Sequence, residues 1–326
     1  MSWAGLWTHI TLRAQSTLPS GLNTERMDNA TTFKLLAAEE NFKQASTLAE
    51  FEFDHLKLLF EKNGEFHVKE HCSRHYSLDD ATLFDDAILV PRDYLTITPL
   101  PGLTQTKRSH DDPSVYIKRP PAILYDPNGK HTGGKYMLHE AVICEVLMKH
   151  PHPNICEYFG YVASAVDGRM EGLCFQRYSQ SLWDLIVGDG RDALDVVPDA
   201  HDVVLKLTVQ GVVEDIKRGI QHLHSLGYAH NDINPSNIML STQGQAVIID
   251  FDSCRKVGES LRTGKAGSPD WSNDSLESDP ASDFYGLEKI EEWLMTKTTE
   301  DEGAHGDSDE LDSESDDCDD SDEIDG

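Results

Sequence analysis

Apolar side chains recur along the chain at spacings that predict its helices and strands. Between residues 203 and 226 they return every three or four positions, which predicts a long amphipathic helix that ends at Gly227. Residues 31–63 show mixed three- and four-residue spacings, so a helix is expected there too, ended by Asn63 and Gly64. The short, continuous apolar run at 246–249 is typical of a buried strand.

The middle of the chain combines strand and helix patterns. Two apolar stretches are joined through Asp167 and Gly168, a pair that favours a tight turn, and together they predict a hairpin. A helix is expected to open at His139 and Glu140 and to end before a proline-rich turn. The strand pattern covers residues 115–118, 158–162 and 170–176. The expected helix covers residues 139–147, and the turn covers residues 151–155.

Three histidines follow one another at four-residue intervals in the N-terminal region. On a helix they would share one face, where a neighbouring acid and a cysteine could add metal ligands. A polar face that mixes histidines with acidic residues is more often simply solvated, and we favour that interpretation. The residues concerned are His67, His71, His75, Glu70 and Cys72.

The net charge of −30 is unevenly distributed along the 326 residues. Residues 300–326 hold fifteen of the 58 acidic residues and no Lys or Arg, which accounts for half of the net charge. A segment so acidic and so poor in apolar residues cannot bury a core, so we expect disorder over 296–326. The remainder is moderately acidic, and we expect no nucleic-acid partner.

Cysteine usage and hydropathy favour an intracellular protein. The six cysteines are scattered without a C-x-x-C pair, as is typical of reduced thiols. The chain has no run of eighteen apolar residues and no basic patch followed by an apolar stretch, so we expect no membrane partner and no secretory signal. A cytoplasmic or nuclear location and a monomeric state are therefore expected.

The polar residues between 228 and 255 indicate the chemistry. One loop holds His230, Asp232 and Asn237. The apolar strand that follows delivers Asp250 at its end. Hard divalent cations prefer oxygen ligands, and a metal-held phosphoryl group needs a nearby carboxylate to orient the attacking hydroxyl. The sequence therefore predicts a site for a divalent metal and a phosphate.

This stretch resembles the catalytic loop and the metal-binding strand of eukaryotic-type protein kinases. The family patterns are H-R-D-x-x-x-x-N and D-F-G, and this chain reads H-N-D-I-N-P-S-N and D-F-D. The resemblance extends over about residues 90–294 and includes an H-P-N-I turn after the expected helix. The sequence of this stretch is similar to that of a group of short fungal protein-kinase-like proteins.

The resemblance implies an α+β fold of two lobes, with a small β-rich N-lobe and a truncated helical C-lobe. The last matching element, residues 283–294, resembles the start of the family's helix F, and the acidic tail replaces what the family builds after it. The implied domains are a partly helical N-terminal extension at 1–85, the N-lobe and hinge at 86–178, the C-lobe at 179–295 and the disordered acidic tail at 296–326.

The resemblance also implies ATP-dependent phosphoryl transfer to Ser or Thr of a protein substrate, with Mg²⁺ as cofactor. Asp232 would accept the proton of the attacking hydroxyl, while Asn237 and Asp250 would hold the metal. Lys118 would contact the phosphates of the nucleotide, and Glu140 would be its ion-pair partner.

Further roles are implied around these residues. Gln176 to Tyr178 would form the hinge that binds adenine through backbone groups, next to Phe175 at the back of the pocket. Ser268 would lie against the catalytic aspartate, and Asp283 would tie down the catalytic loop. The alternative partner for the lysine is a second acid, which would fall on a different helix face; that acid is Glu145.

Besides Asp252 in place of the glycine of D-F-G, the chain departs from the family pattern at three places. The arginine before the catalytic aspartate is Asn231, which leaves no partner for a phosphorylated activation segment. The lysine two positions after the aspartate is Asn234, an amide that donates hydrogen bonds at this catalytic position without carrying charge. Between residue 86 and Lys118 the only glycine is Gly102, so the glycine-rich loop over the phosphates is missing.

Two other functions are compatible with these residues. A kinase of small molecules, resembling aminoglycoside or choline kinases, also uses H-x-D-x-x-x-x-N and lacks the arginine. A pseudokinase that binds partners would explain the missing glycine-rich loop and the absence of the peptide-docking platform that the family builds after helix F. The four intact residues Lys118, Asp232, Asn237 and Asp250 favour an enzyme over a pseudokinase.

Overall fold

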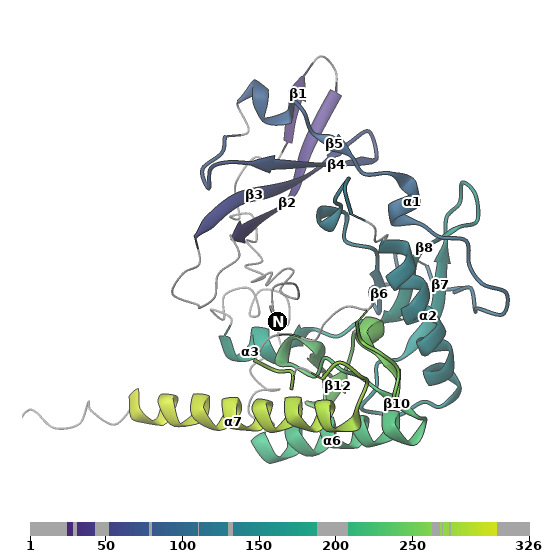
Figure 1. Cartoon of the computed structure of the whole chain (residues 1–326), viewed down its shortest axis with the longest axis vertical. Helices are drawn as coiled ribbons and strands as arrows, with labels where there is room; N and C mark the ends of the chain where they lie inside the picture. Colours follow the sequence, from purple (N-terminus) through teal and green to yellow (C-terminus); the bar gives the residue numbers. More distant parts are fainter. Residues whose placement is uncertain are drawn as a thin grey trace, which may run out of the picture.

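The chain folds as an α+β protein with strand-rich upper parts and a helical lower part (Figure 1). The computed structural model describes residues 25–28, 31–42, 52–77, 80–109, 111–129, 133–187, 208–262, 268, 270–273 and 275–304. The β-rich N-lobe and the helical C-lobe expected from the sequence are confirmed.

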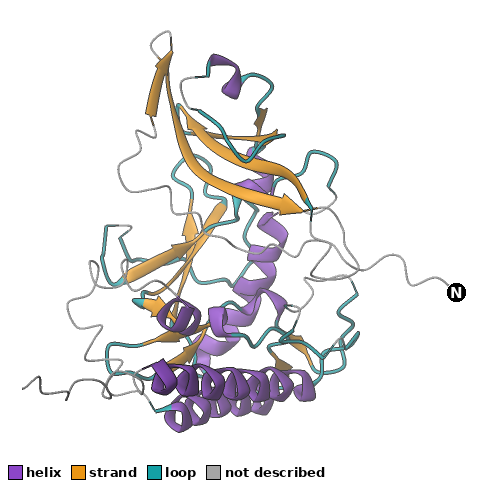
Figure 2. Cartoon of the chain, turned by 90° about the vertical axis from the view of Figure 1, so that its left-hand side faces the viewer, coloured by secondary structure: helices purple, strands orange, loops and turns teal. Residues whose placement is uncertain are grey.

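Strands between residues 25 and 89 form an antiparallel five-stranded sheet, so the helix expected over 31–63 is wrong. The described residues of the extension expected at 1–85 are mainly strand, with one 3-10 helix at Ala81–Phe84, and its bounds as a domain stay a prediction. Neighbouring strands follow chain order, and the long strands of this sheet are drawn orange near the top of Figure 2. Asn63 and Gly64, with φ of 53° and 81°, form a two-residue hairpin turn instead of a helix end. The strands are β1 (Glu25–Asp28), β2 (Thr31–Phe42), β3 (Phe53–Lys62), β4 (Glu65–His71) and β5 (Ile88–Leu89).

The helix-like spacing arises because this sheet is buried on both faces. Leu58 and Phe60 belong to one apolar cluster, and Leu59 between them belongs to another on the opposite face. A register shift between Leu35 and Ala37 also interrupts the alternation within β2. Apolar residues therefore occupy adjacent positions, and the two-residue period of a half-exposed strand is lost.

The predicted histidine ladder lies on and after β4. His71 is the last residue of this strand, and its Nε2 contacts the carbonyl oxygen of His75 at 3.2 Å. Within the described ranges, no group of three or more His, Cys, Asp or Glu side chains could hold a metal ion. The helical face on which such a site was considered does not form.

A second sheet, of order β6-β8-β7, carries Lys118 and packs against helix α2. The hairpin at Asp167 and Gly168 is confirmed. Helix α2 begins at Gly133 instead of His139. The sequence did not predict this start because its glycines pack closely against neighbouring segments but add no apolar periodicity. The elements are β6 (Val115–Lys118), β7 (Tyr158–Ala163), β8 (Met170–Gln176), α2 (Gly133–Lys149), the short helix α1 (Arg92–Leu95) before them and the 3-10 turn Ala122–Leu124.

The segment that leads toward Lys118 runs along the outer edge of β7. Thr106 N donates to Tyr161 O at 2.9 Å, and Tyr161 N donates to Thr104 O at 2.8 Å. Lys118 lies on β6, at the opposite side of the three-stranded order. The backbone upstream of the lysine is thus committed to β7, in agreement with the missing glycine-rich pattern.

The C-lobe is built on helices α6 and α7, which lie side by side (Figures 1 and 2). Ile216, Ile220 and Ile290 are fully buried in the core that they share with the second sheet. Helix α6 ends before Gly227 as expected, and residues 203–207 of the predicted helix lie outside the described ranges. The elements are α3 (Leu182–Val187), α6 (Val209–Ser225), α7 (Pro280–Ala304), β9 (Gln180–Ser181), β10 (Tyr228–Ala229), β11 (Ile238–Leu240), β12 (Ala246–Ile248) and β13 (Arg255–Lys256).

Helix α7 continues to Ala304, so the predicted start of the tail at 296 is wrong. Ile290 and Leu294 anchor the helix in the core. Once a helix is nucleated, each further residue adds one backbone hydrogen bond for the one residue that it fixes, so the helix extends past these anchors. The rest of the predicted tail, residues 305–326, lies outside the described ranges.

Three of the five tryptophans of the chain meet beside α7. Trp183 of α3 stacks on Trp293 with ring centroids 5.8 Å apart and planes 3° from parallel. Trp271 meets Trp293 edge-on at 6.0 Å. The aromatic cluster therefore joins α3, α7 and the segment that follows Ser268.

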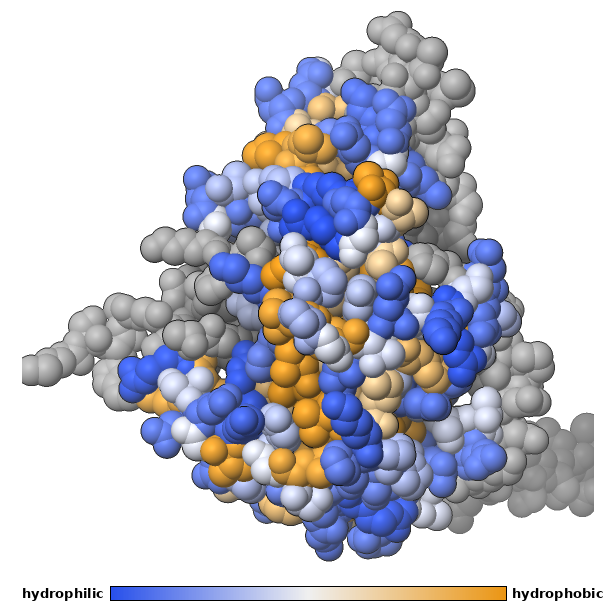
Figure 3. All heavy atoms as spheres, turned by 90° about the vertical axis from the view of Figure 1, so that its right-hand side faces the viewer, coloured by the Kyte–Doolittle hydropathy of each residue, from blue (hydrophilic) through white to orange (hydrophobic). Residues whose placement is uncertain are grey.

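The face on the right of Figure 1 mixes polar side chains with a band of apolar ones (Figure 3).

Among the helices that the structure describes, none is long and apolar enough to cross a membrane. The monomeric state and the cytoplasmic or nuclear location stay predictions.

Gly160 lets the backbone of residues 104–106 approach β7. Its φ is 114°, and a Cβ atom there would lie 2.5 Å from Thr104 O and 2.8 Å from Thr106 N. We expect Gly160→Ala to lower the free energy of unfolding by about 3 kcal/mol, because backbone strain and the clash add. Gly168→Ala has positive φ but open space, and should cost about 1 kcal/mol. Urea unfolding compares the two, and equal costs would contradict the close approach.

Candidate active site

Lys118 lies between two carboxylates contributed by distant parts of the chain. Its Nζ atom is 2.6 Å from Glu140 Oε2 on α2 and 2.7 Å from Asp250 Oδ1 after β12. The other oxygen of Glu140, Oε1, accepts a hydrogen bond from Phe251 N at 3.2 Å. Glu145, the alternative partner, is used elsewhere and accepts from the backbone N and the hydroxyl of Thr104. The structure therefore brings together the pair that the sequence predicted.

The glutamate of the ion pair is removed from water, whereas the side chain of Lys118 is 28% exposed. Glu140 is only 1% exposed. Burial by itself lowers the pKa of Lys118, but the carboxylates of Asp250 and Glu140 outweigh it and hold that pKa well above its usual value. Burial also raises the pKa of Glu140, because the ammonium of Lys118 offsets only part of the lost hydration. The lysine consequently keeps its charge throughout the neutral range.

Asp232 lies in the loop after β10, and three residues donate hydrogen bonds to it. Asn237 Nδ2 donates to its carbonyl oxygen at 2.9 Å and to Oδ2 at 3.1 Å. Asn234 Nδ2 donates to Oδ1 at 3.0 Å, and Ser268 N donates to the same oxygen at 2.8 Å. Asp232 is 5% exposed, so these bonds fix the carboxylate of a nearly buried residue. The predicted contact of Ser268 with the aspartate is present.

The backbone of this loop is anchored by Asp283 near the start of α7. One oxygen of Asp283 accepts from His230 N at 2.8 Å and the other accepts from Asn231 N at 2.7 Å. Asn231 has a φ of 64°, the left-handed region that asparagine tolerates better than most residues. Asp283 is fully buried, so it acts through the loop backbone and not only on the dipole of its own helix.

Three further bonds join this loop to the segment that carries Asp250. His230 Nε2 donates to Ile249 O at 3.0 Å, and Ile249 N donates to Asn237 O at the same distance. Asn231 Nδ2 donates to Ser253 O at 3.1 Å. The side-chain amide of Asn231, which stands where the family has arginine, therefore donates to backbone carbonyl groups of Ala229 and Ser253.

The predicted hinge lies at the end of β8. Gln176 N donates to Glu157 O at 2.9 Å, and Tyr178 is partly buried against the main core. Burial raises the pKa of the Tyr178 hydroxyl. Phe175 is 5% exposed and its ring lies 5.4 Å from that of Tyr158. The role of these residues as a hinge and their contact with adenine stay predictions.

The donors at Asn237 and Asp250 fit a hard divalent cation. Asn237 uses its amide N–H groups on Asp232, so its amide oxygen is the end that a cation would meet. Asp250 contributes a carboxylate, and one of its oxygens contacts Lys118. Mg²⁺ is commonly held by one or two protein carboxylates together with the phosphates of a nucleotide, and this small donor set matches that requirement.

Two histidines support the site although the sequence reasoning assigned them no role. His224 Nε2 donates to Asp283 Oδ2 at 2.8 Å, and His139 Nε2 donates to the carbonyl of Cys254 at 2.7 Å. Their positions in the sequence could have indicated these roles. His139 directly precedes Glu140, and His224 lies in the last turn of α6. Both hold elements that carry the predicted site residues.

Comparison with known proteins gives one family and several fungal relatives. The model of the protein kinase domain matches residues 122–287. A probable serine/threonine-protein kinase of Schizosaccharomyces pombe is 30% identical over 125 residues, which is 38% of this chain and 15% of that protein. The serine/threonine-protein kinase ste20 of Aspergillus fumigatus is 29% identical over 137 residues, covering 40% of this chain and 15% of the relative. The chain thus spans only a small part of the length of these relatives.

Asp283 offers a test of the loop anchor. Asp283→Ala would leave two buried backbone N–H groups without acceptors, and we expect the free energy of unfolding to fall by about 4 kcal/mol. Asp279→Ala removes an exposed capping carboxylate from the same helix and should cost about 1 kcal/mol. Denaturant titration followed by circular dichroism compares them. A small effect at Asp283 would show that the loop does not depend on it.

Proposed function

Because this chain belongs to the protein kinase domain family, we propose that it transfers the terminal phosphoryl group of ATP to Ser or Thr hydroxyls of a protein substrate. The observation that carries the proposal is the meeting of Lys118 with Glu140 and Asp250, three residues from separate elements. Bonds from Asn237 to Asp232, and from Ile249 to Asn237, connect this group to the catalytic loop. Phosphoryl transfer depends mainly on such positioning and on charge.

Each residue has a defined task in this proposal. Asp232 orients the acceptor hydroxyl and takes its proton, and its own carboxylate is kept in place by the donors on Oδ1 and Oδ2. Lys118 contacts the phosphates, and Glu140 keeps its ammonium group aimed into the site. Asn237 and Asp250 would hold Mg²⁺, which when bound with ATP supplies the charge that neutralises the reacting phosphates.

The nucleotide base has a matching location in this proposal. Backbone groups of Gln176 and Tyr178 would bind adenine, with Phe175 behind it. No glycine-rich loop covers the phosphates, since residues 104–106 are bonded to β7 instead. Lys118 and the metal site then carry a larger share of phosphate binding than in relatives with such a loop.

The choice of a protein hydroxyl as acceptor is supported by the relatives and by the segment around Ser268. The matched proteins from Schizosaccharomyces pombe and Aspergillus fumigatus are named as serine/threonine-protein kinases. Ser268 contacts both Asp232 and Asn234, as expected for the end of an activation segment beside a catalytic aspartate. These observations favour the protein kinase over a kinase of small molecules.

A thermal-shift titration tests the nucleotide site. Mg²⁺-ATP at about 100 times its Kd should stabilise the folded chain by about 2.7 kcal/mol and raise its Tm. Asp250→Asn should reduce the part of the shift that depends on Mg²⁺, because it removes a carboxylate from the metal site. Asp111→Asn, the same change at an exposed position, should behave like the wild type.

The outcomes separate the competing functions. No stabilisation by Mg²⁺-ATP in the wild type would overturn the enzymatic proposal and favour a pseudokinase. Stabilisation followed by phosphate transfer to an amino alcohol or a sugar, but to no Ser- or Thr-containing peptide, would overturn the acceptor class. Transfer of radiolabelled phosphate to a peptide library would support the whole proposal.

Asn234 sets the rate in this proposal. Its Nδ2 atom donates to Asp232 Oδ1 and to Ser268 Oγ, so it fills the position of the family's lysine without the charge. We expect Asn234→Lys to raise kcat about tenfold, because a charged donor stabilises the transferring phosphate more strongly. Gln243→Lys adds the same charge on an exposed turn and should leave kcat unchanged. Unchanged or lower turnover for Asn234→Lys would contradict this role.

A further inference from the structure

Helix α2, which carries Glu140, begins in close contact with the segment that leaves the N-terminal sheet. A Cβ atom on Gly133 would lie 2.6 Å from the Cβ of Pro120 and 3.3 Å from the ring of Tyr94. A Cβ atom on Gly134 would lie 3.0 Å from Thr96 O. Only glycine fits this approach, so the start of α2 is fixed against α1 and against the linker that follows Lys118.

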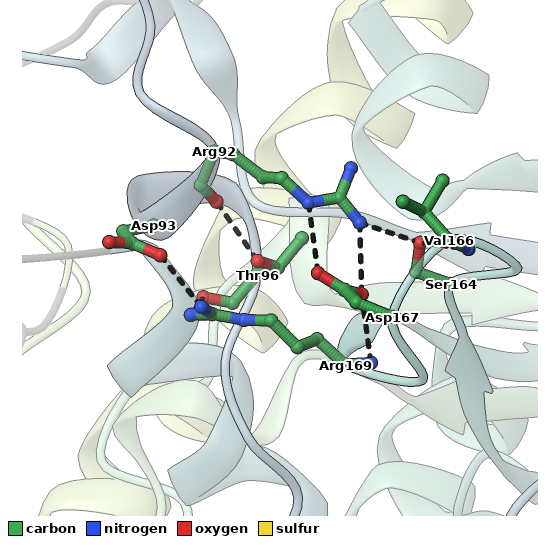
Figure 4. Close-up of polar contacts among 7 residues, drawn as sticks. All are labelled: Arg92, Asp93, Thr96, Ser164, Val166, Asp167 and Arg169. Carbon is green, nitrogen blue, oxygen red and sulfur yellow. Dashed lines mark hydrogen bonds and ion pairs between the residues drawn. The ribbon is translucent and has the colours of Figure 1, made fainter.

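Helix α1 is itself held from the other side by the β7–β8 turn (Figure 4). Arg92 donates to Ser164 Oγ at 2.7 Å and to both carboxylate oxygens of Asp167 at 3.0 and 3.1 Å. Arg169 donates in return to Asp93 at 2.7 Å. The two arginines cross between the segments, so α1 cannot shift without breaking both ion pairs.

The linker between Lys118 and α2 is covered by the N-terminal sheet. Ala122 and Ile123, at 7% and 5% exposure, pack in one apolar cluster with Leu59 of β3, Val68 of β4 and Tyr94 of α1. Strands β3 and β4 of the N-terminal sheet contact the 3-10 turn of this linker. A buried apolar contact of this kind resists separation of the two sheets.

A polar contact adds direction to that packing. Lys57 Nζ on β3 donates to Tyr125 O at 2.8 Å, close to the end of the 3-10 turn. Tyr94 lies beside it, with its ring 5.2 Å from that of Tyr125 and its hydroxyl 3.4 Å from Pro121 O. The linker is therefore bound through two of its carbonyl groups, and both donors lie outside the β6-β8-β7 sheet.

A helix is stiff enough to carry this restraint to the site. Glu140 lies seven residues after Gly133, or about 10 Å along the axis. Its carboxylate contacts Lys118 at 2.6 Å and Phe251 N at 3.2 Å, distances that tolerate little displacement of the helix. The position of the N-terminal sheet thus bears on the geometry of the ion pair.

We propose that the N-terminal sheet is a built-in positioning module for α2, and that Lys57 and Tyr94 are the positioning residues through which it keeps Glu140 against Lys118. This inference rests on the proposed function for its effect on catalysis, since the ion pair is taken to hold the nucleotide. The sheet then does for this chain, in one polypeptide, what a separate activating partner would have to do by binding.

The test uses Lys57→Met in the full chain, with Lys69→Met as the matched control. Lys69 also reaches from the sheet to backbone carbonyls, those of Thr82 and Asp85, but these belong to the sheet's own covering turn. Hydrogen exchange is measured without nucleotide on peptides that cover residues 137–145. We expect about fivefold faster exchange in Lys57→Met and wild-type rates in Lys69→Met. Lys57→Arg, which keeps a donor, should restore slow exchange.

The nucleotide provides a second readout. Lys57→Met should raise the Kd for Mg²⁺-ATP about fivefold, and Lys69→Met should leave it unchanged. Equal loosening of α2 by both lysine variants, or by neither, would overturn the positioning role of Lys57. If the wild type binds no Mg²⁺-ATP, the proposed function fails, whereas the exchange rates in the absence of nucleotide still decide the positioning.

Discussion

A buried carboxylate requires a cation, and the architecture of this protein follows from meeting that requirement at Glu140. An unpaired charge in such an environment would be costly enough to favour protonation or local unfolding. The lysine that compensates it comes from β6, and its second partner comes from the loop after β12. These contacts consequently join the β6-β8-β7 sheet, helix α2 and the C-lobe, because each of the three supplies only one of the charged groups.

The same site is also supported by helices α6 and α7 of the C-lobe. Asp283 accepts hydrogen bonds from two backbone N–H groups of the loop that carries Asp232, and His224 contacts the same carboxylate from α6. Two helices of the C-lobe therefore share one anchor for a loop that has little regular structure of its own. This arrangement explains how a loop with so little regular structure can hold Asp232 in a fixed orientation.

The sequence predicted the site better than it predicted the N-terminal region, for a physical reason. The residues around Asp232 and Asp250 are adjacent in the chain or fixed by short spacing, and polar groups of this kind have few interpretations. The apolar residues of β3 have several, because a strand covered on both faces shows no two-residue period and Leu58 to Phe60 read as helix. The start of α2 was missed since its glycines report close packing, which only the folded neighbours Pro120 and Tyr94 reveal.

The tryptophan cluster beside α7 has a consequence for how the protein is observed. Trp183, Trp271 and Trp293 are close enough for their excited states to couple, and Trp271 follows directly on the segment that contacts Asp232. A rearrangement of that segment would alter the overlap of the rings and with it the near-ultraviolet dichroism and the emission. The chain thus carries an intrinsic optical label next to its catalytic loop.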